Sequence, residues 1–459
     1  MQLSTQAIPG WRRLPYIIIM RRRARFPLLA AGAALLLGAA LAAERLEDTI
    51  FIPLDHPAIL YDGATADPVG RLAKRLSAGQ LKLDYAPNGW GYLPALLKEL
   101  GIPADSQVLV FSHTSIQVEH ISPRTPRAIY FNDDSSVGYV QNGDALELTS
   151  LDPRQGVILY SLDPTPASRP VLARRDDCLR CHQGPVTLAV PGLLISSVHP
   201  ASGRPGEEHG NAFMTDHRTP FSQRWGGWYV SGTHGAQTHL GNNLELVDPV
   251  RPGAASLKGT QNVTDLSGWF DTSRYLVPSS DLVALLVLEH QTRMTNLLIR
   301  IGWDGRIAQH DGQFATPRAQ LPAQLAAEID ELVAYMLFGD EAPLREPVAG
   351  VSGFSKTFPQ RGPRDKQGRS LRDFDLRTRL FRYPLSYMIY SAAFDGLPGF
   401  VRDRIYQRLY AILTGQDSSA SVGGLSLKNL STDDRRAILE IVRETKPNLP
   451  AYWTAASAK

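Results

Sequence analysis

The feature that most constrains this chain is the placement of its cysteines. Only two occur in 459 residues, and both stand in the run Cys178-Leu-Arg-Cys181-His182. A disulfide-rich scaffold is therefore excluded, and the fold has to be built by burying apolar side chains. Hydrophobic residues make up 43% of the chain and charged residues 20%, which is typical of a folded protein rather than a disordered one.

The C-x-x-C-H spacing is that of covalent haem attachment. Two thiols at this spacing reach the two vinyl groups on one porphyrin edge, and the following imidazole can bind the iron. We therefore predict one haem c, bonded to Cys178 and Cys181, with His182 as the proximal ligand of the iron.

Three other interpretations of the cysteines remain open. A redox dithiol usually follows a strand that feeds a helix, and the flanks ARRDD and QGPVT do not show that pattern. A zinc site completed by His234 and His239 would need to bridge fifty-two residues after Cys181, far more than a zinc finger has. A plain disulfide is the third alternative, because an exported protein permits it.

The first 43 residues have the composition of an export signal. They carry six Arg and no acidic residue, with RRRAR at 21–25 followed by an uncharged apolar run at 26–43. Small residues at Ala40 and Ala42 suit the −3 and −1 positions of a cleavage site. We predict a signal peptide over 1–43, with an uncleaved anchor as the alternative, and we hypothesise that translation starts at Met20.

The predicted compartment agrees with the predicted cofactor. Haem c is attached after export, so a signal and a C-x-x-C-H motif on one chain imply a periplasmic protein served by the cytochrome c maturation machinery. A periplasmic redox partner follows from the same reasoning. Without the leader the chain has 42 Lys and Arg against 45 Asp and Glu, which argues against nucleic-acid binding. Membrane contact is expected only if the leader is not cleaved.

A second iron ligand has several candidates. Six of the eleven His lie between 182 and 239. His239 and His234 rank first, and His290 follows because it lies on the apolar face of a predicted helix and so faces the interior. Met214 ranks last. For each residue alone, an ordinary core or loop position is the stronger interpretation.

The hydrophobic periodicity predicts an α+β fold with no repeats. Residues 48–170 are expected to be mixed α/β, 171–278 a loop-rich haem-binding region, 279–340 helical, 341–375 a linker and 376–459 a helical end. Strands are predicted at 107–112, 127–131, 136–140 and 156–160, and early helices at 69–77 and 90–100. Later helices are predicted from 279 to a stop at Gly302, at 321–338, 384–394 and 399–413, and at 431–444 with a capping box at Ser431 and Asp434.

Several runs resemble a family of exported bacterial proteins described as cytochrome c domain-containing. The runs are Tyr130–Asp134, Cys178–His182, Pro191–Gly192, Thr215–His217, Arg224–Tyr229, His239–Asn242 and Leu288–Gln291. The resemblance covers residues from about 100 to the C-terminus. It implies a single covalent haem in a body much larger than a small cytochrome, with Cys178, Cys181 and His182 as its haem residues.

These observations favour an exported c-type cytochrome that transfers single electrons. An enzyme of peroxidase-like or other small-molecule redox chemistry is an alternative, because electron transfer alone does not require so long a chain. Asp216, His217 and Arg218 would then be candidates for acid–base chemistry. A haem-based sensor or binding module is the third hypothesis.

Overall fold

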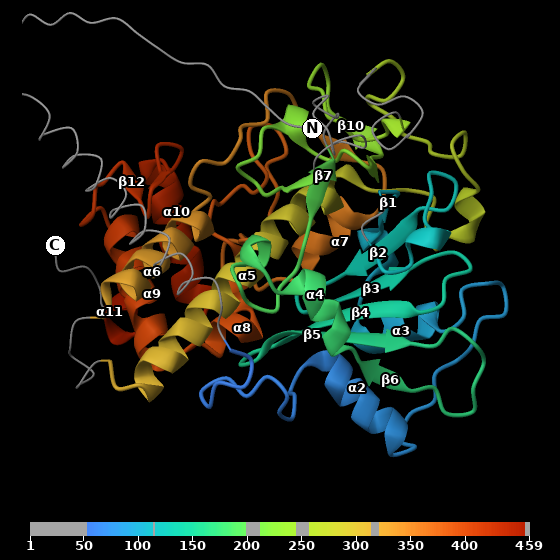
Figure 1. The fold of residues 1–459 in the computed structure, drawn as a ribbon. Coiled ribbons are helices and arrows are strands. Elements are labelled where there is room, and N and C mark those ends of the chain that lie inside the picture. The colour runs from blue at the N-terminus through green and yellow to red at the C-terminus, as the bar shows by residue number, and fades with distance from the viewer. Residues whose placement is uncertain (1–52, 113–114, 199–211, 245–256, 314–320, 455–459) are drawn as a thin grey trace, which may run out of the picture. The chain divides into compact units, whose positions relative to one another are not determined.

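The computed structural model describes residues 53–112, 115–198, 212–244, 257–313 and 321–454. Residues from 52 to the C-terminus form one compact unit. The predicted leader, 1–43, lies outside the described residues. The predicted α+β class is confirmed, with 36% helix, 15% strand, a sheet in the N-terminal half and helices in the C-terminal half (Figure 1).

An antiparallel seven-stranded sheet organises the N-terminal half, in the order β6-β5-β4-β3-β2-β1-β9. Its strands are β1 Val108–Val110, β2 Arg127–Phe131, β3 Ser135–Tyr139, β4 Leu146–Asp152, β5 Gly156–Leu162, β6 Leu172–Arg174 and β9 Trp228–Tyr229. The strands β1 to β6 are neighbours in chain order. Asn142, with φ 57°, lies in the turn before β4. The edge strand β9 comes from the loop-rich region and pairs Tyr229 with Leu109.

The two faces of this sheet differ in how completely they are covered. One face, which includes Tyr130, Val137 and Leu148, is buried under helices α2 (Pro68–Ser77) and α3 (Leu93–Leu100). On the other face Ile129, Ser136 and Thr149 are only partly buried. Side chains alternate between faces along a strand, so these three residues lie on the second face, which is only partly covered at these positions.

The long helix α5 (Leu282–His310) crosses the middle of the molecule (Figure 1). Asp281 caps its start by accepting hydrogen bonds from the N–H groups of Val283 and Ala284. The predicted stop at Gly302 is wrong, because the helix continues to His310. Gly302 instead lets Leu397 approach, since a Cβ there would lie 3.3 Å from the Leu397 Cδ2 atom.

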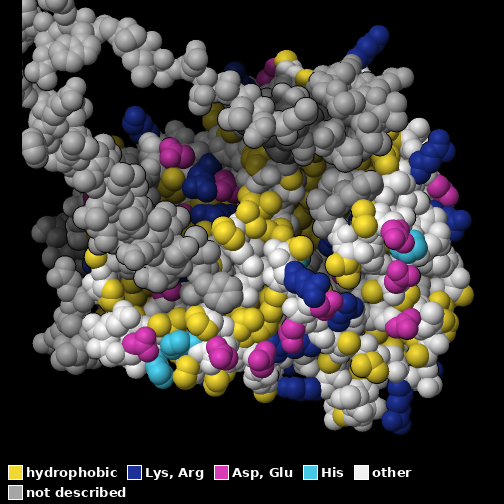
Figure 2. Space-filling model, viewed as in Figure 1, with side chains coloured by type: hydrophobic (Ala, Val, Ile, Leu, Met, Phe, Trp, Pro, Cys, Tyr) yellow, Lys and Arg dark blue, Asp and Glu magenta, His cyan; other side chains and the backbone are white. Residues whose placement is uncertain are grey.

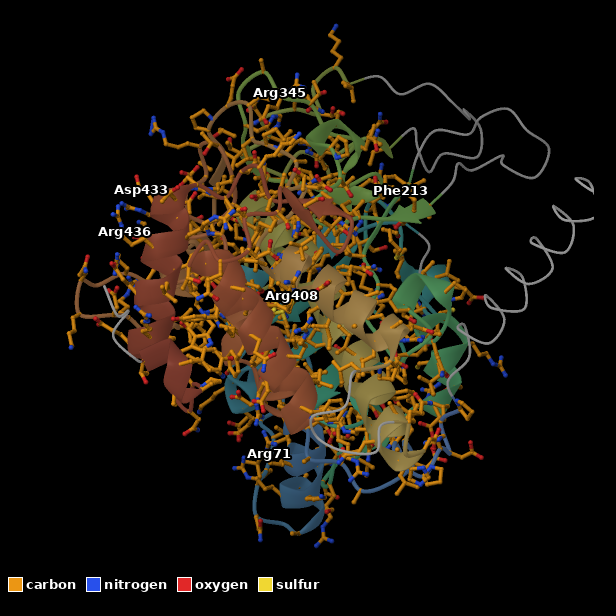
Figure 3. All side chains as sticks on the ribbon, turned by 90° about the vertical axis from the view of Figure 1, so that its left-hand side faces the viewer. Arg71, Phe213, Arg345, Arg408, Asp433 and Arg436 are labelled. Carbon is orange, nitrogen blue, oxygen red and sulfur yellow. The ribbon has the colours of Figure 1, made fainter. Side chains whose placement is uncertain are left out.

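The C-terminal helices pack as layers on α5. They are α6 Ala323–Met336, α7 Phe354–Gln360, α8 Ala392–Asp395, α9 Gly399–Leu413, α10 Thr432–Thr445 and α11 Ala451–Thr454. Figure 3 shows Arg408 on α9, where its guanidinium binds Asp330 of α6 at 2.6 Å. The predicted capping box is present, because Ser431 Oγ accepts from the Asp434 N–H at 3.0 Å and the Asp434 carboxylate accepts from Ser431 N–H at 3.1 Å.

The remaining elements are short and lie mainly in connections. They are α4 Leu179–His182, β7 Ser196–Val198, β8 Ala212–Met214, β10 Gly232–Thr233, β11 Ala349–Gly350, β12 Ser421–Val422 and β13 Leu425–Ser426. The segment 341–375 joins two helical regions, and it also contributes the buried rings of Phe354 and Phe358 to the core. In the described part of the chain no helix is both long and apolar enough to cross a membrane.

Candidate haem site

The C-x-x-C-H motif forms one helical turn beside the half-covered face of the sheet. Cys178 ends a 3-10 turn, and Cys181 and His182 lie on α4. Both thiols are free, with Cys178 partly buried and Cys181 exposed. Around α4, the space-filling view shows basic and acidic side chains side by side (Figure 2), and Arg174 pairs with Asp176 at 3.1 Å.

The imidazole of His182 is held in the orientation that an iron ligand requires. Its Nδ1 lies 2.9 Å from the carbonyl oxygen of Gly192, which can only accept, so Nδ1 carries the proton. Nε2 is then left with its lone pair, and it has no hydrogen-bond partner among the described residues. Burial lowers the pKa of His182, so the ring is neutral near pH 7. A proximal histidine needs this tautomer and this charge.

Helix α5 fixes the loop that holds His182. The Asn296 side chain accepts a hydrogen bond from the Leu193 N–H at 2.8 Å and donates one to the Leu193 carbonyl at 2.9 Å. The neighbouring Gly192 N–H donates to the His182 carbonyl at 2.8 Å. Gly192 also lies so close to Asn296 that a Cβ would come within 2.5 Å of its Oδ1. Asn296 therefore positions the loop whose Gly192 carbonyl binds His182, and no sequence pattern marked it.

A cavity opens beside His182, between the sheet and α5. The cavity is small, with an enclosed volume of about 70 Å³, and it is open on one side, so a haem would extend beyond it through that opening. Apolar side chains line part of it, and hydroxyl, amide and acidic groups line the rest. The apolar set includes Ile129, Leu193, Leu194, Leu288 and Trp228, and the polar set includes Asp133, Asp134, Ser136, Thr149, Gln291, Thr292 and Thr295. A free imidazole nitrogen, two thiols on the same turn and an apolar wall are a donor set that fits haem c.

Arg127 is a basic group in the cavity wall that the sequence analysis missed. Its Nη2 pairs with Glu147 at 3.2 Å, and its buried Nε has no hydrogen-bond partner. A guanidinium with a spare donor suits a propionate. Arg174 and Arg175, just before the motif, are already paired with Asp176 and Asp177. Arg127 stands at the start of a strand, and nothing in the neighbouring sequence distinguishes it from an ordinary surface arginine.

The four distal candidates do not line this cavity. His290 lies 2.8 Å from His217 (Nδ1 to Nδ1) and 2.8 Å from Ser386 (Nε2 to Oγ). The rings of His234 and His239 pack against each other with centroids 4.7 Å apart, and Met214 is exposed. His290 is fully buried, which confirms that it faces the interior. The structure does not bring these side chains to His182, and their ranking stays a prediction.

A second polar cluster, buried at its centre, packs against α5 outside the cavity lining. Arg224 and Glu289 form an ion pair of 2.8 Å, with side chains 4% and 0% exposed. Arg224 also donates to the His217 carbonyl at 2.9 Å, and Asp216 pairs with Arg218 at 2.6 Å. All of these residues except Arg218 come from the runs that carried the family resemblance. They hold the loop-rich region to α5, away from the cavity wall.

No family model, no curated protein and no solved structure matches this chain. The site itself therefore supports the proposed function, and the family resemblance stays a prediction. The site consists of the motif, the clamp on His182 and the adjoining cavity.

Proposed function

We propose that this protein is an exported c-type cytochrome with one haem bonded to Cys178 and Cys181 and ligated by His182, and that it transfers single electrons. The observation that carries the proposal is the hydrogen bond from His182 Nδ1 to the Gly192 carbonyl, which presents Nε2 as a ligand. It favours metal ligation through His182 over a dithiol or a disulfide, because neither of those uses the histidine, whereas a zinc-bound histidine makes the same hydrogen bond. The C-x-x-C-H spacing itself favours haem over zinc.

Haem bound here supplies a one-electron redox couple whose potential depends on its ligands and burial. The residues of the chain orient and shield it. The Gly192 carbonyl keeps the His182 ring in place and increases its basicity. Trp228 and Leu288, 4% and 8% exposed, exclude water from one side, and Arg127 offers a positive charge. Transfer then needs a periplasmic redox partner that docks close to α4.

A redox enzyme or a sensor with an open distal site is the second candidate function. The cavity lining supports it, because among the described residues His182 is the only histidine in that lining and no methionine, lysine or tyrosine belongs to it. Asp134 also lines the cavity, and burial raises its pKa to about 6, near the value that suits proton exchange at neutral pH. A small molecule would reach the distal side through the open mouth.

The test begins with expression of the full chain in a bacterium that has a periplasmic cytochrome c maturation system. The pigment should stay with the polypeptide in acidified organic solvent, and it should be released from a Cys178→Ala, Cys181→Ala double variant. Arg180→Gln is the matched control, because it changes the same turn at a position that bonds nothing in haem c. A colourless wild-type protein from the periplasm contradicts the proposal.

Carbon monoxide separates the two candidate functions. A reduced haem whose spectrum ignores carbon monoxide supports simple electron transfer, because a strong second ligand then closes the iron. A spectrum that shifts on addition of carbon monoxide supports the open site. Single replacements of His234, His239 and His290 identify any sixth ligand by the loss of its low-spin spectrum.

A further inference from the structure

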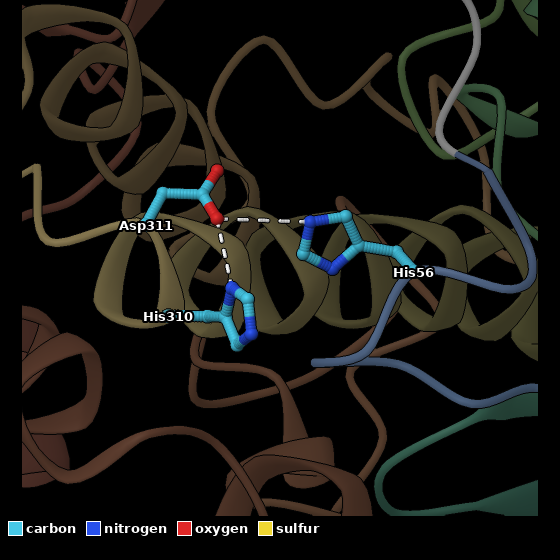
Figure 4. Close-up of side chains that lie close together, drawn as sticks. All are labelled: His56, His310 and Asp311. Atoms are coloured by element: carbon cyan, nitrogen blue, oxygen red, sulfur yellow. Dashed lines mark hydrogen bonds and ion pairs between the residues drawn. The ribbon is translucent and has the colours of Figure 1, made fainter.

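A separate group of metal-ligating side chains lies at the C-terminal end of α5. His310 is the last residue of the helix, Asp311 follows it, and His56 reaches them from the segment that precedes α2. Figure 4 shows both imidazole rings beside the carboxylate of Asp311, with their contacts converging on one oxygen. Fifteen residues of helix separate His310 from Thr295 in the cavity wall, or about 22 Å along the axis.

The ligand atoms have spacings close to those of a tetrahedral site. His310 Nδ1 lies 2.8 Å from Asp311 Oδ1, and His56 Nε2 lies 3.8 Å from the same oxygen. One donor atom from each of the three residues fits within a span of 4.8 Å. Two ligands bound to zinc at about 2.0 Å are about 3.3 Å apart, between the two distances. Small side-chain rotations would therefore suffice to close the three around an ion.

We propose that His56, His310 and Asp311 bind a divalent transition metal ion, with Zn²⁺ as the reference ion. Two imidazoles and one carboxylate form the nitrogen and oxygen set that zinc accepts, with a fourth position left for water. The side chains are 19%, 48% and 41% exposed, so an ion can reach them. The carbonyl groups at the end of a helix also favour a cation.

Two arginines near the site donate hydrogen bonds to backbone carbonyls and keep their positive charges. Arg154 and Arg306 line a shallow pocket together with His310. Arg154 donates to the Ala58 carbonyl at 3.1 Å, and Arg306 donates to the Gly396 carbonyl at 2.6 Å. Their positive charges oppose a second cation, so the proposed site needs the carboxylate of Asp311 for its affinity. Asp311→Asn is therefore expected to weaken Zn²⁺ binding more than either histidine variant.

Metal binding requires one local exchange of hydrogen bonds. His56 Nδ1 accepts from the Ala58 N–H at 3.1 Å, which places the proton of the free imidazole on Nε2. Coordination through Nε2 moves that proton to Nδ1 and removes the acceptor of the Ala58 N–H, so the bound ion has to offset the loss of this hydrogen bond at a buried residue. The bound ion would then join the segment before α2 to the end of α5, two regions 254 positions apart in the sequence.

Calorimetric titration of tag-free, matured protein with Zn²⁺ alone tests the proposal. We expect one ion per chain and an affinity at least tenfold weaker in each of His56→Gln, His310→Gln and Asp311→Asn. His120→Gln is the control, because His120 has a similar exposed carboxylate contact, 3.3 Å to Asp144, and belongs to no three-ligand group among the described residues.

Thermal unfolding provides a second measurement that does not depend on haem. Zn²⁺ should raise the melting temperature of the wild type and of His120→Gln and leave the three ligand variants unchanged, with all metal-free melting temperatures equal. The absorbance of the haem should stay the same throughout. Equal Zn²⁺ affinity in wild type and all three ligand variants, or equal loss in the control, would overturn the proposal.

Discussion

Replacing Asn296 with leucine tests whether α5 positions the proximal histidine. Asn296 is 3% exposed, and its amide makes two hydrogen bonds to the backbone of Leu193, at 2.8 and 2.9 Å. Leucine has a similar size but neither donor nor acceptor. The substitution therefore removes both bonds, loosens the loop around Gly192 and releases the carbonyl that orients His182.

The magnitude follows from the two backbone groups that lose their partners. An unsatisfied buried polar group costs about 1–3 kcal/mol, and Leu193 is only partly buried, so we expect the free energy of unfolding to fall by about 2–4 kcal/mol. Thr295→Val on the same helix is the matched control. Thr295 is 1% exposed and its hydroxyl makes no hydrogen bond, so the change should stay within about 1 kcal/mol.

Urea unfolding followed by circular dichroism measures both variants. If Asn296→Leu and Thr295→Val unfold at the same urea concentration, the clamp does not contribute as argued. The absorbance and midpoint potential of the matured protein give a second readout. An unchanged haem spectrum and potential in a destabilised Asn296→Leu protein would show that the clamp stabilises the loop without positioning His182.

Three further predictions concern the core. Glu289→Leu should lower the free energy of unfolding by about 3–5 kcal/mol, because it leaves the buried Arg224 cation without this acceptor, and urea unfolding would disprove this with a loss below 1 kcal/mol. Glutamine should cost less, because burial raises the pKa of Glu289 to about 7 and glutamine resembles the protonated acid. Burial lowers the pKa of His239 from 6.5 to about 3, so only the unfolded chain gains this proton as the pH falls from 6.5 towards 3. Stability should therefore fall over that range, and His239→Asn should reduce the slope by up to about 1.4 kcal/mol per pH unit, measured by urea unfolding at several pH values. Gly305→Ala should destabilise by about 1–3 kcal/mol, because the new Cβ would lie 2.6 Å from Val401, and an unchanged melting temperature would contradict it.

Secondary structure could be predicted where it depends on the hydrophobic pattern of neighbouring residues. The strand at 127–131 is found at those residues, and the helix expected at 69–77 begins one residue earlier at Pro68. Strand β4, Leu146–Asp152, was not predicted although its buried and partly buried residues alternate. The length of α5 was missed because a glycine inside a helix looks like a stop until its packing partner is known. Tertiary contact, which a single sequence does not display, decided that case.

The candidate site could likewise be predicted only where its residues are close together in the sequence. Cys178, Cys181 and His182 are adjacent in sequence, so their spacing alone carried the haem prediction. The clamp is different, since Asn296 lies more than a hundred residues from the histidine it supports. For His290, the apolar face correctly indicated the interior but could not show that the imidazole would meet His217 instead of the cavity.

The late addition of one edge strand to the sheet would affect haem attachment in the proposed cytochrome. Strands β6 and β9 form opposite edges of the sheet, and the C-x-x-C-H turn lies in the chain between them. Strand β9 pairs with β1, some 120 residues earlier, so this edge requires a long loop to close and should form late in folding. We expect the newly exported chain to keep its thiols accessible during that interval, which would give the attachment enzymes time to act before the second edge is in place.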